Sequence, residues 1–126
     1  MTAQRRELAE YRLEKAFKTL ADAKILPLAS ESTVNRIYYA VFYAAGALLI
    51  TRGLAASKHS GVLALFSKEF VKTGVMEQKH GKFLYDMFDR RQEGDYRDFV
   101  RFDPEEVKTW IKDAEDFITS VSKQLK

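Results

Sequence analysis

The sequence predicts an all-α fold, an up-and-down helical bundle of four to five helices. Amphipathic segments follow one another along the chain, with apolar residues at helical spacing and short connections between them. The 126 residues include only two prolines, and no repeat, linker or low-complexity tract interrupts the pattern. This length is typical of one domain. We therefore expect a single helical domain over residues 1–126.

The first two predicted helices are separated by Pro27. The first covers residues 2–25 and ends before this proline, which cannot continue a helix. The second begins at a serine that caps it, either Ser30 or Ser32, and runs to about Arg52, where a glycine follows as a natural stop.

The second helix is predicted to be the central rod of the bundle. Residues 37–50 are almost continuously apolar, and several alanines there let neighbouring helices approach closely. The stretch is short for a membrane span, and polar groups interrupt its first half. We therefore expect a helix buried in protein, with no membrane partner. Its polar front end is the first place to look for function.

Three further helices complete the predicted bundle. The third covers residues 57–74, with Ser57 as its cap, and the fourth runs from residue 77 to between 95 and 99. The last begins at Asp103 and runs to residue 125. A proline and two glutamates follow Asp103, as is typical of the positive end of a helix dipole. Residues 92–102 could instead form an irregular turn.

Composition excludes several kinds of site. The chain has no cysteine, which excludes disulfides and thiolate chemistry, and its first residues lack the apolar run of a signal peptide. We therefore expect a cytoplasmic protein. The formal net charge of +3 is mild, and bases alternate with acids. This pattern differs from the basic face of a duplex-DNA binder, but it is compatible with an anionic partner.

Familiar catalytic and cofactor motifs are absent from the sequence. There is no glycine-rich phosphate loop, metalloprotease motif, calcium loop or nucleophile elbow. The two histidines, His59 and His80, are far apart in the sequence, and no carboxylates are spaced to complete a metal site with them. We therefore predict neither a metal nor a cofactor.

The first candidate binding cluster lies at the start of the second helix. Arg36, Tyr39 and Tyr43 share one helical stripe, and Asn35 lies beside Tyr39. The tyrosines could pack by their rings and send their hydroxyls to the surface, with Arg36 in solvent. Alternatively, the four side chains form part of a ligand site.

The second candidate is the segment that contains Arg90, Arg91, Asp95 and Tyr96. Arg91 and Asp95 continue the inward stripe of the fourth helix, and Arg90 lies at the edge of this stripe. A guanidinium carried toward the interior needs a partner, so an ion pair with Asp95 that sets the helix register is one interpretation. The other is an arginine directed at a phosphate from a groove.

The third candidate is the start of the third helix, where backbone N–H groups are available to an anion. Together with these groups, Ser57, Lys58, His59 and Ser60 could hold an anion. The alternative is an ordinary capped helix entrance.

Three segments together resemble the HEPN domain family (higher eukaryotes and prokaryotes nucleotide-binding). They are YYAVFYAAGALL, SKHSG followed by VLALFSKEFVKTG, and RRQEGDY. The resemblance extends over residues 5–122 and is strongest to the small, stand-alone prokaryotic branch of unassigned function. It implies a bundle of four or five helices, usually as a two-fold dimer. Many members are metal-independent ribonucleases, and small ones often pair with a minimal nucleotidyltransferase as toxin and antitoxin.

Catalytic members of that family carry an arginine and, four to six residues later, a histidine near the end of a late helix. Two such motifs face each other across the dimer and cleave RNA with its own 2′-hydroxyl as nucleophile. Counted from Arg90, the position at which the family has its histidine is occupied by Asp95 in this chain. An ionised aspartate is a poor general acid at neutral pH and repels phosphate. Arg52 and His59 have a suitable interval, but Gly53 and a loop lie between them. The resemblance therefore implies a member without this catalysis.

We expect a homodimeric binding module that accepts a nucleotide or RNA and pairs with a nucleotidyltransferase. One alternative is a metal-independent RNA endonuclease toxin, in which His59 reaches Arg90 or Arg91 from the next helix. Another is a purely structural partner that docks through an exposed face. The expectation of a dimer comes from the nine Phe and six Tyr, several of them on helix faces that a single small bundle is not expected to cover. The expected groove is lined by Arg36, Tyr39, Arg90, Arg91 and Asp95.

Overall fold

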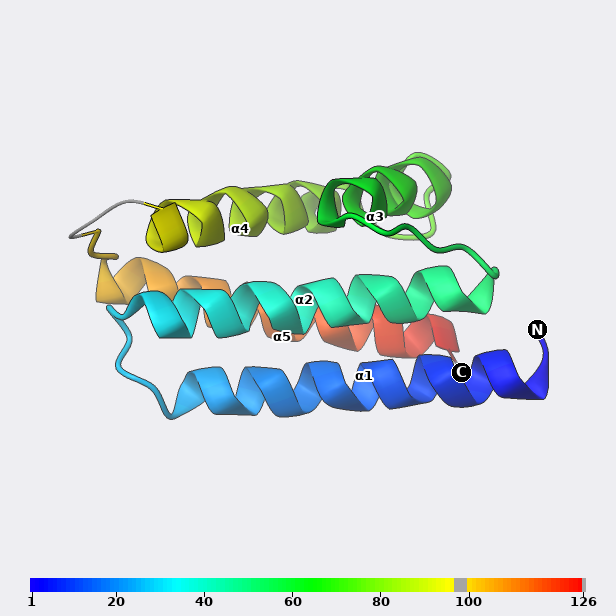
Figure 1. The fold of residues 1–126 in the computed structure, drawn as a ribbon, viewed down its shortest axis with the longest axis horizontal. Helices are drawn as coiled ribbons and strands as arrows, with labels where there is room; N and C mark the ends of the chain where they lie inside the picture. The colour runs from blue at the N-terminus through cyan, green and yellow to red at the C-terminus, as the bar shows by residue number, and fades with distance from the viewer. Residues whose placement is uncertain (97–99, 126) are drawn as a thin grey trace.

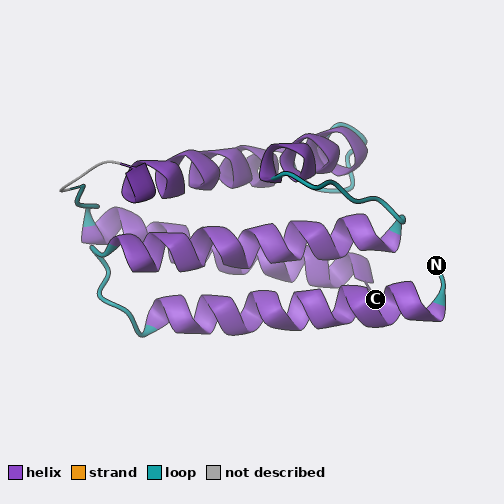
Figure 2. Cartoon of the chain, in the orientation of Figure 1, coloured by secondary structure: helices purple, strands orange, loops and turns teal. Residues whose placement is uncertain are grey.

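The fold is the predicted all-α bundle. The computed structural model describes the backbone of residues 1–96 and 100–125 and the side chains of residues 1–94 and 100–125. Short loops join the helices (Figure 2). In this part of the chain the elements are α1 (Ala3–Lys24), α2 (Glu31–Thr51), α3 (His59–Phe66), the π-helical turn η1 (Ser67–Val71), α4 (Gln78–Tyr96) and α5 (Pro104–Leu125).

The centre of the bundle is α2. It packs against α1, α3, α4 and α5. In Figure 1 it lies between α1 on one side and α3 with α4 on the other. Among the described helices, α2 is the one that is long and apolar enough to cross a membrane, but 61% of its most apolar window is buried inside the bundle. It is therefore the core helix that its sequence predicts.

Small side chains let the other helices approach α2 closely. Ala40, Ala44, Ala45 and Ala47 are fully buried, as is the larger Ile37. Protein interiors are packed as densely as organic crystals, so these positions have little room for a side chain larger than the alanine methyl group. The core is therefore built around the alanines of one helix.

Two helices begin at the side-chain caps that the sequence predicts. Ser30 caps α2, since its Oγ accepts a hydrogen bond from the Thr33 amide at 3.1 Å. Asp103 caps α5, since its Oδ1 accepts a hydrogen bond from the Glu105 amide at 3.1 Å. Of the two serines considered for α2, the structure selects Ser30.

The third helix differs from its prediction. It begins at His59, after Lys58, whose side chain makes no capping hydrogen bond, so Ser57 is not the cap. At Ser67 the helix widens into η1, where the Lys72 amide donates to the Ser67 carbonyl, five residues earlier, at 2.9 Å. The predicted continuous helix is therefore an α-helix followed by a π-helical turn.

The end of α4 packs closely on the start of α2. A Cβ atom at Gly94 would lie 3.3 Å from the Glu31 Cβ, so the glycine permits this approach. The helix continues to Tyr96, which restricts the predicted irregular turn to residues after it. Residues 97–99 of that turn lie outside the described part.

Candidate functional site

Side chains from three helices meet on one side of α2. The Arg91 guanidinium of α4 lies over the rings of Tyr38 and Tyr39 of α2, with its central carbon 5.4 Å from each ring centroid. The Tyr38 hydroxyl is 2.8 Å from Nδ1 of His59, the first residue of α3. We call Tyr38, Tyr39, His59 and Arg91 the Arg91–His59 cluster.

Aromatic rings hold the His59 imidazole in one orientation. The imidazole stacks on Phe42, with 4.2 Å between centroids and 21° between planes. It also stacks on Tyr38, with centroids 5.7 Å apart, and Tyr39 meets it edge-on at 5.7 Å. Stacked and edge-on contacts are the preferred geometries of such rings, so the packing that positions α3 also positions its histidine.

Burial and charge set the protonation states in this cluster. Burial raises the pKa of Tyr38, and the positive charge of Arg91 opposes this rise without cancelling it. Burial, and then the Arg91 charge, lower the pKa of His59 below its ordinary value of 6.5. At neutral pH the Tyr38 hydroxyl is therefore protonated and the imidazole is neutral.

The hydrogen bond between Tyr38 and His59 indicates which imidazole nitrogen carries the proton. Tyr38 is fully buried, and a buried hydroxyl hydrogen needs an acceptor. The neighbouring Arg91 offers only donors. The hydroxyl therefore donates to Nδ1 of His59, and the neutral ring carries its proton on Nε2.

Arg36 brings a second guanidinium to Tyr39. Its Nε and Nη2 donate to Asn35 Oδ1 at 3.2 and 2.7 Å, and its central carbon is 5.4 Å from the Tyr39 centroid. Three residues of the expected groove, Arg36, Tyr39 and Arg91, are therefore together. Two guanidiniums therefore lie near one ring, and each carries N–H groups of the kind that bind anionic groups.

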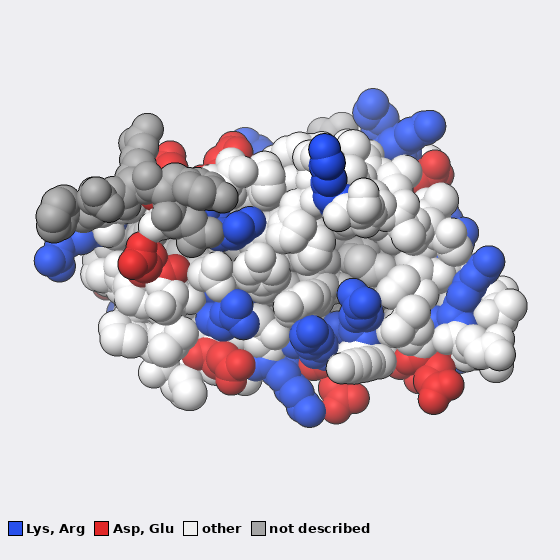
Figure 3. Space-filling model, in the orientation of Figure 1, with Lys and Arg blue, Asp and Glu red and all other residues white. Residues whose placement is uncertain are grey.

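Tyr43 extends the line of aromatic rings toward α1. Its ring centroid is 5.8 Å from that of Tyr39, and Lys15 Nζ lies 4.5 Å from the Tyr43 centroid. The aromatic rings of α2 therefore lie beside cations of two helices, Arg36 of α2 and Lys15 of α1. On the face that α1 and α2 form toward the viewer, Lys and Arg lie across the middle, and Asp and Glu lie nearer the lower edge (Figure 3).

Arg90 faces away from this cluster. Its guanidinium lies 4.1 Å from the Trp110 centroid, and its Nη1 is 3.5 Å from Met87 Sδ. Adjacent residues of an α-helix are turned by about 100° from each other, so Arg90 and Arg91 do not share a groove. Arg90 instead lines a hollow of about 490 Å³ between α4 and α5, where three carboxylates make a poor anion site.

Two predicted site residues lie outside the described side chains. The backbone of Asp95 and Tyr96 belongs to α4, but their side chains are not among those that the structure describes. The ion pair expected between Arg91 and Asp95, and the effect of Asp95 on phosphate, therefore stay predictions.

The anion site expected at the start of α3 is divided in the structure. His59 turns inward to Tyr38, whereas Ser57, Lys58 and Ser60 are exposed. The four side chains do not share one hydrogen-bond network, because the histidine belongs to the Arg91–His59 cluster.

Arg52 is not the arginine that accompanies His59. Its guanidinium lies 4.3 Å from the Phe70 centroid, and its Nη1 donates to the Glu69 carbonyl at 2.8 Å. The arginine that shares Tyr38 with His59 is Arg91. The sequence suggested that combination only for the endonuclease alternative, because it requires two different helices to meet.

Two residues of the site were missing from the sequence-based predictions. Tyr38 supplies the hydrogen bond to His59, and Phe42 supplies the stacking surface. A signal for Tyr38 was present, since its helical spacing from Val34, Val41 and Ala45 turns it inward and a buried tyrosine hydroxyl usually finds a partner. The identity of that partner is a tertiary property.

The second histidine packs α4 against α5. His80 is buried, its Nε2 is 3.2 Å from Ser120 Oγ, and its ring meets Phe117 edge-on. Burial lowers the pKa of His80, and the negative charge of Asp116 opposes this shift only in part. Among the residues that the structure describes, no group of three or more His, Asp or Glu side chains is placed to hold a metal ion.

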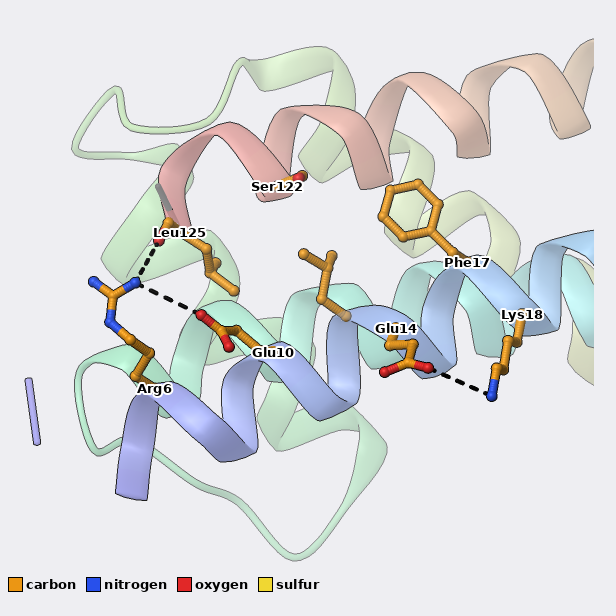
Figure 4. Close-up of a pocket in the computed structure, with 8 residues that line it drawn as sticks. Arg6, Glu10, Glu14, Phe17, Lys18, Ser122 and Leu125 are labelled. Carbon is orange, nitrogen blue, oxygen red and sulfur yellow. Dashed lines mark hydrogen bonds and ion pairs between the residues drawn. The ribbon is translucent and has the colours of Figure 1, made fainter. Parts of the chain in front are cut away.

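A separate hollow of about 450 Å³ lies between α1 and the end of α5. Figure 4 shows Phe17 and Leu125 on its sides. At its rim, Arg6 pairs with Glu10 at 3.7 Å and donates to the Leu125 carbonyl at 3.3 Å. An apolar hollow with neutralised rim charges suits a protein surface better than a phosphate group.

Comparison with known proteins agrees with the sequence resemblance. The family model described as the HEPN domain matches residues 9–124. A "UPF0332 protein" of Thermotoga maritima is 49% identical over 123 residues, which cover 95% of this chain and 92% of that protein.

Two proteins of Methanocaldococcus jannaschii are also similar to this chain. "Putative toxin MJ0142" is 34% identical over 96% of this chain and 83% of its own length. "Putative toxin MJ0605" is 35% identical over 96% of this chain and 91% of its own length. Both alignments span the Arg91–His59 cluster, since each covers nearly all of this chain.

Proposed function

Because this chain belongs to the HEPN domain family, we propose that it is a toxin-like module that binds the phosphate group of a nucleotide or RNA at the Arg91–His59 cluster. The observation that carries the proposal is the approach of Arg36 and Arg91 to the same ring, Tyr39, at 5.4 Å each. The names of two relatives support a toxin-like setting. The proposed setting includes a homodimer and a minimal nucleotidyltransferase partner.

The chemistry of the cluster suits a phosphate group. Guanidiniums donate paired N–H groups in a geometry that matches phosphate oxygens. The neutral His59 adds an Nε2–H donor next to them. The adjoining aromatic rings offer faces on which the bases of a single strand stack. Binding therefore needs no metal ion to neutralise the phosphate.

Binding without cleavage is the primary proposal, because cleavage demands two proton transfers. When the 2′-oxygen forms its bond to phosphorus, its hydroxyl proton must leave, and the departing 5′-oxygen must gain a proton as its bond breaks. Among the described side chains, the cluster supplies His59 for one of these transfers. A second transfer group would have to come from another chain or from water.

A ribonuclease is the second candidate, and one observation favours it. Arg91 and His59 both contact Tyr38, so a charge stabiliser and a proton-transfer group lie side by side. Incubation of single-stranded RNA with purified protein in EDTA tests this candidate. Cleavage that His59→Gln abolishes would support it, and intact RNA would leave binding as the function.

Isothermal titration calorimetry with AMP and with a short single-stranded RNA tests the binding proposal. Loss of a charge-assisted hydrogen bond is worth about 1.5–3 kcal/mol, so Arg91→Ala should weaken binding at least about tenfold. Arg36→Ala should act in the same direction. The matched control is Arg90→Ala, because this arginine is adjacent in sequence but lies on Trp110. Equal affinities of the Arg91 and Arg90 variants would contradict the proposal.

A further inference from the structure

A pocket of about 320 Å³ adjoins the Arg91–His59 cluster on the side nearer α1. It lies between α1, α2 and the loop that leads into α3. Phe42 and Tyr43 contribute aromatic walls, and Leu54 and Val62 contribute aliphatic ones. Among the described residues that line it, Arg12 is the only charged one. The pocket is therefore apolar, with one set of N–H donors available at its edge.

Gly46 leaves one side of this pocket open to the backbone of α2. A Cβ atom built on Gly46 would meet no atom within 4 Å. Alanine would fit there and is a better helix former than glycine, so neither packing nor helix formation explains the glycine. A flat ring could lie directly against the exposed helix backbone.

Two aromatic residues that line the pocket also contact residues of the proposed phosphate site. Phe42 lines the pocket and also stacks on His59 at 4.2 Å. Tyr43 lines the pocket, and its ring lies 5.8 Å from Tyr39, over which Arg91 is placed. A molecule that has an anionic group and a flat ring a short distance apart could occupy both places at once.

We propose that this pocket binds the base of a nucleotide whose phosphate is held at the Arg91–His59 cluster. The inference rests on the proposed function and extends it to a second subsite. A nucleobase fits the surroundings because it is flat, stacks on aromatic rings and has ring nitrogens that accept hydrogen bonds from an arginine. Arg12 is the donor in this arrangement, and Phe42 and Tyr43 are the stacking surfaces.

NMR titration of the ¹⁵N-labelled protein with adenosine and with AMP tests the two subsites separately. Adenosine lacks phosphate, so it should shift the Gly46 amide and its neighbours in the native chain and equally in Arg91→Ala. Gly46→Leu fills the pocket and should abolish these shifts. It should also weaken AMP binding about tenfold, the scale of one lost stacking contact. The matched control, Tyr85→Leu, introduces leucine at an exposed position of α4 away from the pocket and should change affinity by less than about twofold.

The outcomes separate this inference from the phosphate site. If adenosine shifts the Gly46 region but Arg91→Ala does not weaken AMP, the base pocket stands and the phosphate proposal fails. Absence of adenosine shifts at Gly46 overturns the inference, because the pocket then does not bind a nucleobase. Unchanged AMP affinity in a folded Gly46→Leu protein, with helical circular dichroism retained, also overturns it.

Discussion

At the scale of single residues, Tyr38 connects the core to the site. Its ring is fully buried in the bundle, and its hydroxyl reaches Nδ1 of His59. The same residue therefore contributes apolar burial to folding and a hydrogen bond to the orientation of an imidazole. A residue of this kind affects stability and site chemistry together, and the two effects can be measured separately.

We predict that Tyr38→Phe destabilises the fold by about 1–2 kcal/mol, because the substitution keeps the buried ring but removes its partly buried hydrogen bond to His59. It should also change the ¹⁵N shifts of His59, since the proton is no longer directed to Nε2. Urea unfolding and histidine NMR measure the two effects. The control is Tyr85→Phe on α4, where the tyrosine is exposed. A His59 spectrum that Tyr38→Phe leaves unchanged would contradict the assigned hydrogen bond.

The two histidines predict how stability depends on pH. The pKa values of His59 and His80 are lowered in the folded state, mainly by burial. Below about pH 6.5 the unfolded chain therefore binds more protons than the folded chain, so the free energy of unfolding should fall as pH decreases from 7 to 5. Urea unfolding across this range measures the slope. The double variant with glutamine at both positions should have a flatter profile, and an equally steep one would contradict the assignment.

At the scale of elements, α2 shows how position decides the effect of added volume. Ala44 is fully buried between helices, whereas a Cβ at Gly46 meets open space. The two positions lie two residues apart on one helix and therefore point in different directions. The helix combines a tightly packed side with a side that keeps a hollow.

Ala44→Leu should destabilise the protein by about 1–3 kcal/mol, because the added atoms have no room in a packed interior. Gly46→Ala should instead stabilise it by about 0.5–1 kcal/mol, because alanine restricts the unfolded chain and favours helix. Thermal and urea unfolding of both variants compare the two positions directly. Similar losses for both would show that the hollow above Gly46 closes in solution.

Helix periodicity explains which elements were predictable from sequence. Apolar spacing, Pro27 and the caps at Ser30 and Asp103 predict the α-helices, because each signal acts within a few residues. The π-helical turn has no such local signal. The meeting of His59 with Tyr38 was not predicted either, since it depends on how the loop after α2 returns α3 to the helix that precedes it.

The candidate site was predictable only to the extent that local geometry decides it. Arg36 and Tyr39 are one turn apart on a single helix, so their contact follows from helical spacing. Arg90 was wrongly included in the groove with Arg91, because a run of two arginines suggests one patch although the helix separates their directions. Contacts between helices determine the rest of the site.

At the scale of the whole molecule, α1 carries the half-exposed side of the hollow that it forms with the end of α5. Phe17 lines this hollow and is 43% exposed, and Glu10 and Glu14 lie on the same side of α1. In an antiparallel pair of α1 helices with the two-fold axis near Glu14, Glu10 would face Lys18 of the second copy. This complementarity makes α1 the face we propose for the homodimer.

Sedimentation velocity at micromolar concentration should therefore show a dimer. Phe17→Glu should dissociate it, because the substitution places two unpaired charges in a closely packed apolar contact. The control is Tyr85→Glu, which adds the same charge to α4 at a similarly exposed position. A monomeric native protein would refute the dimer, and a dimer that persists in the Phe17 variant would place the interface elsewhere.

The π-helical turn at Ser67–Val71 has a consequence for residues that it does not contact. A π turn accommodates one extra residue within an α-helix, so deleting one residue there should leave a regular α-helix whose two ends keep their faces. Deleting one residue between His59 and Phe66, within α3 itself, should instead turn His59 by about 100° about the helix axis, away from Phe42 and Tyr38. The orientation of the imidazole should therefore tolerate a one-residue deletion in the π turn but not one in α3.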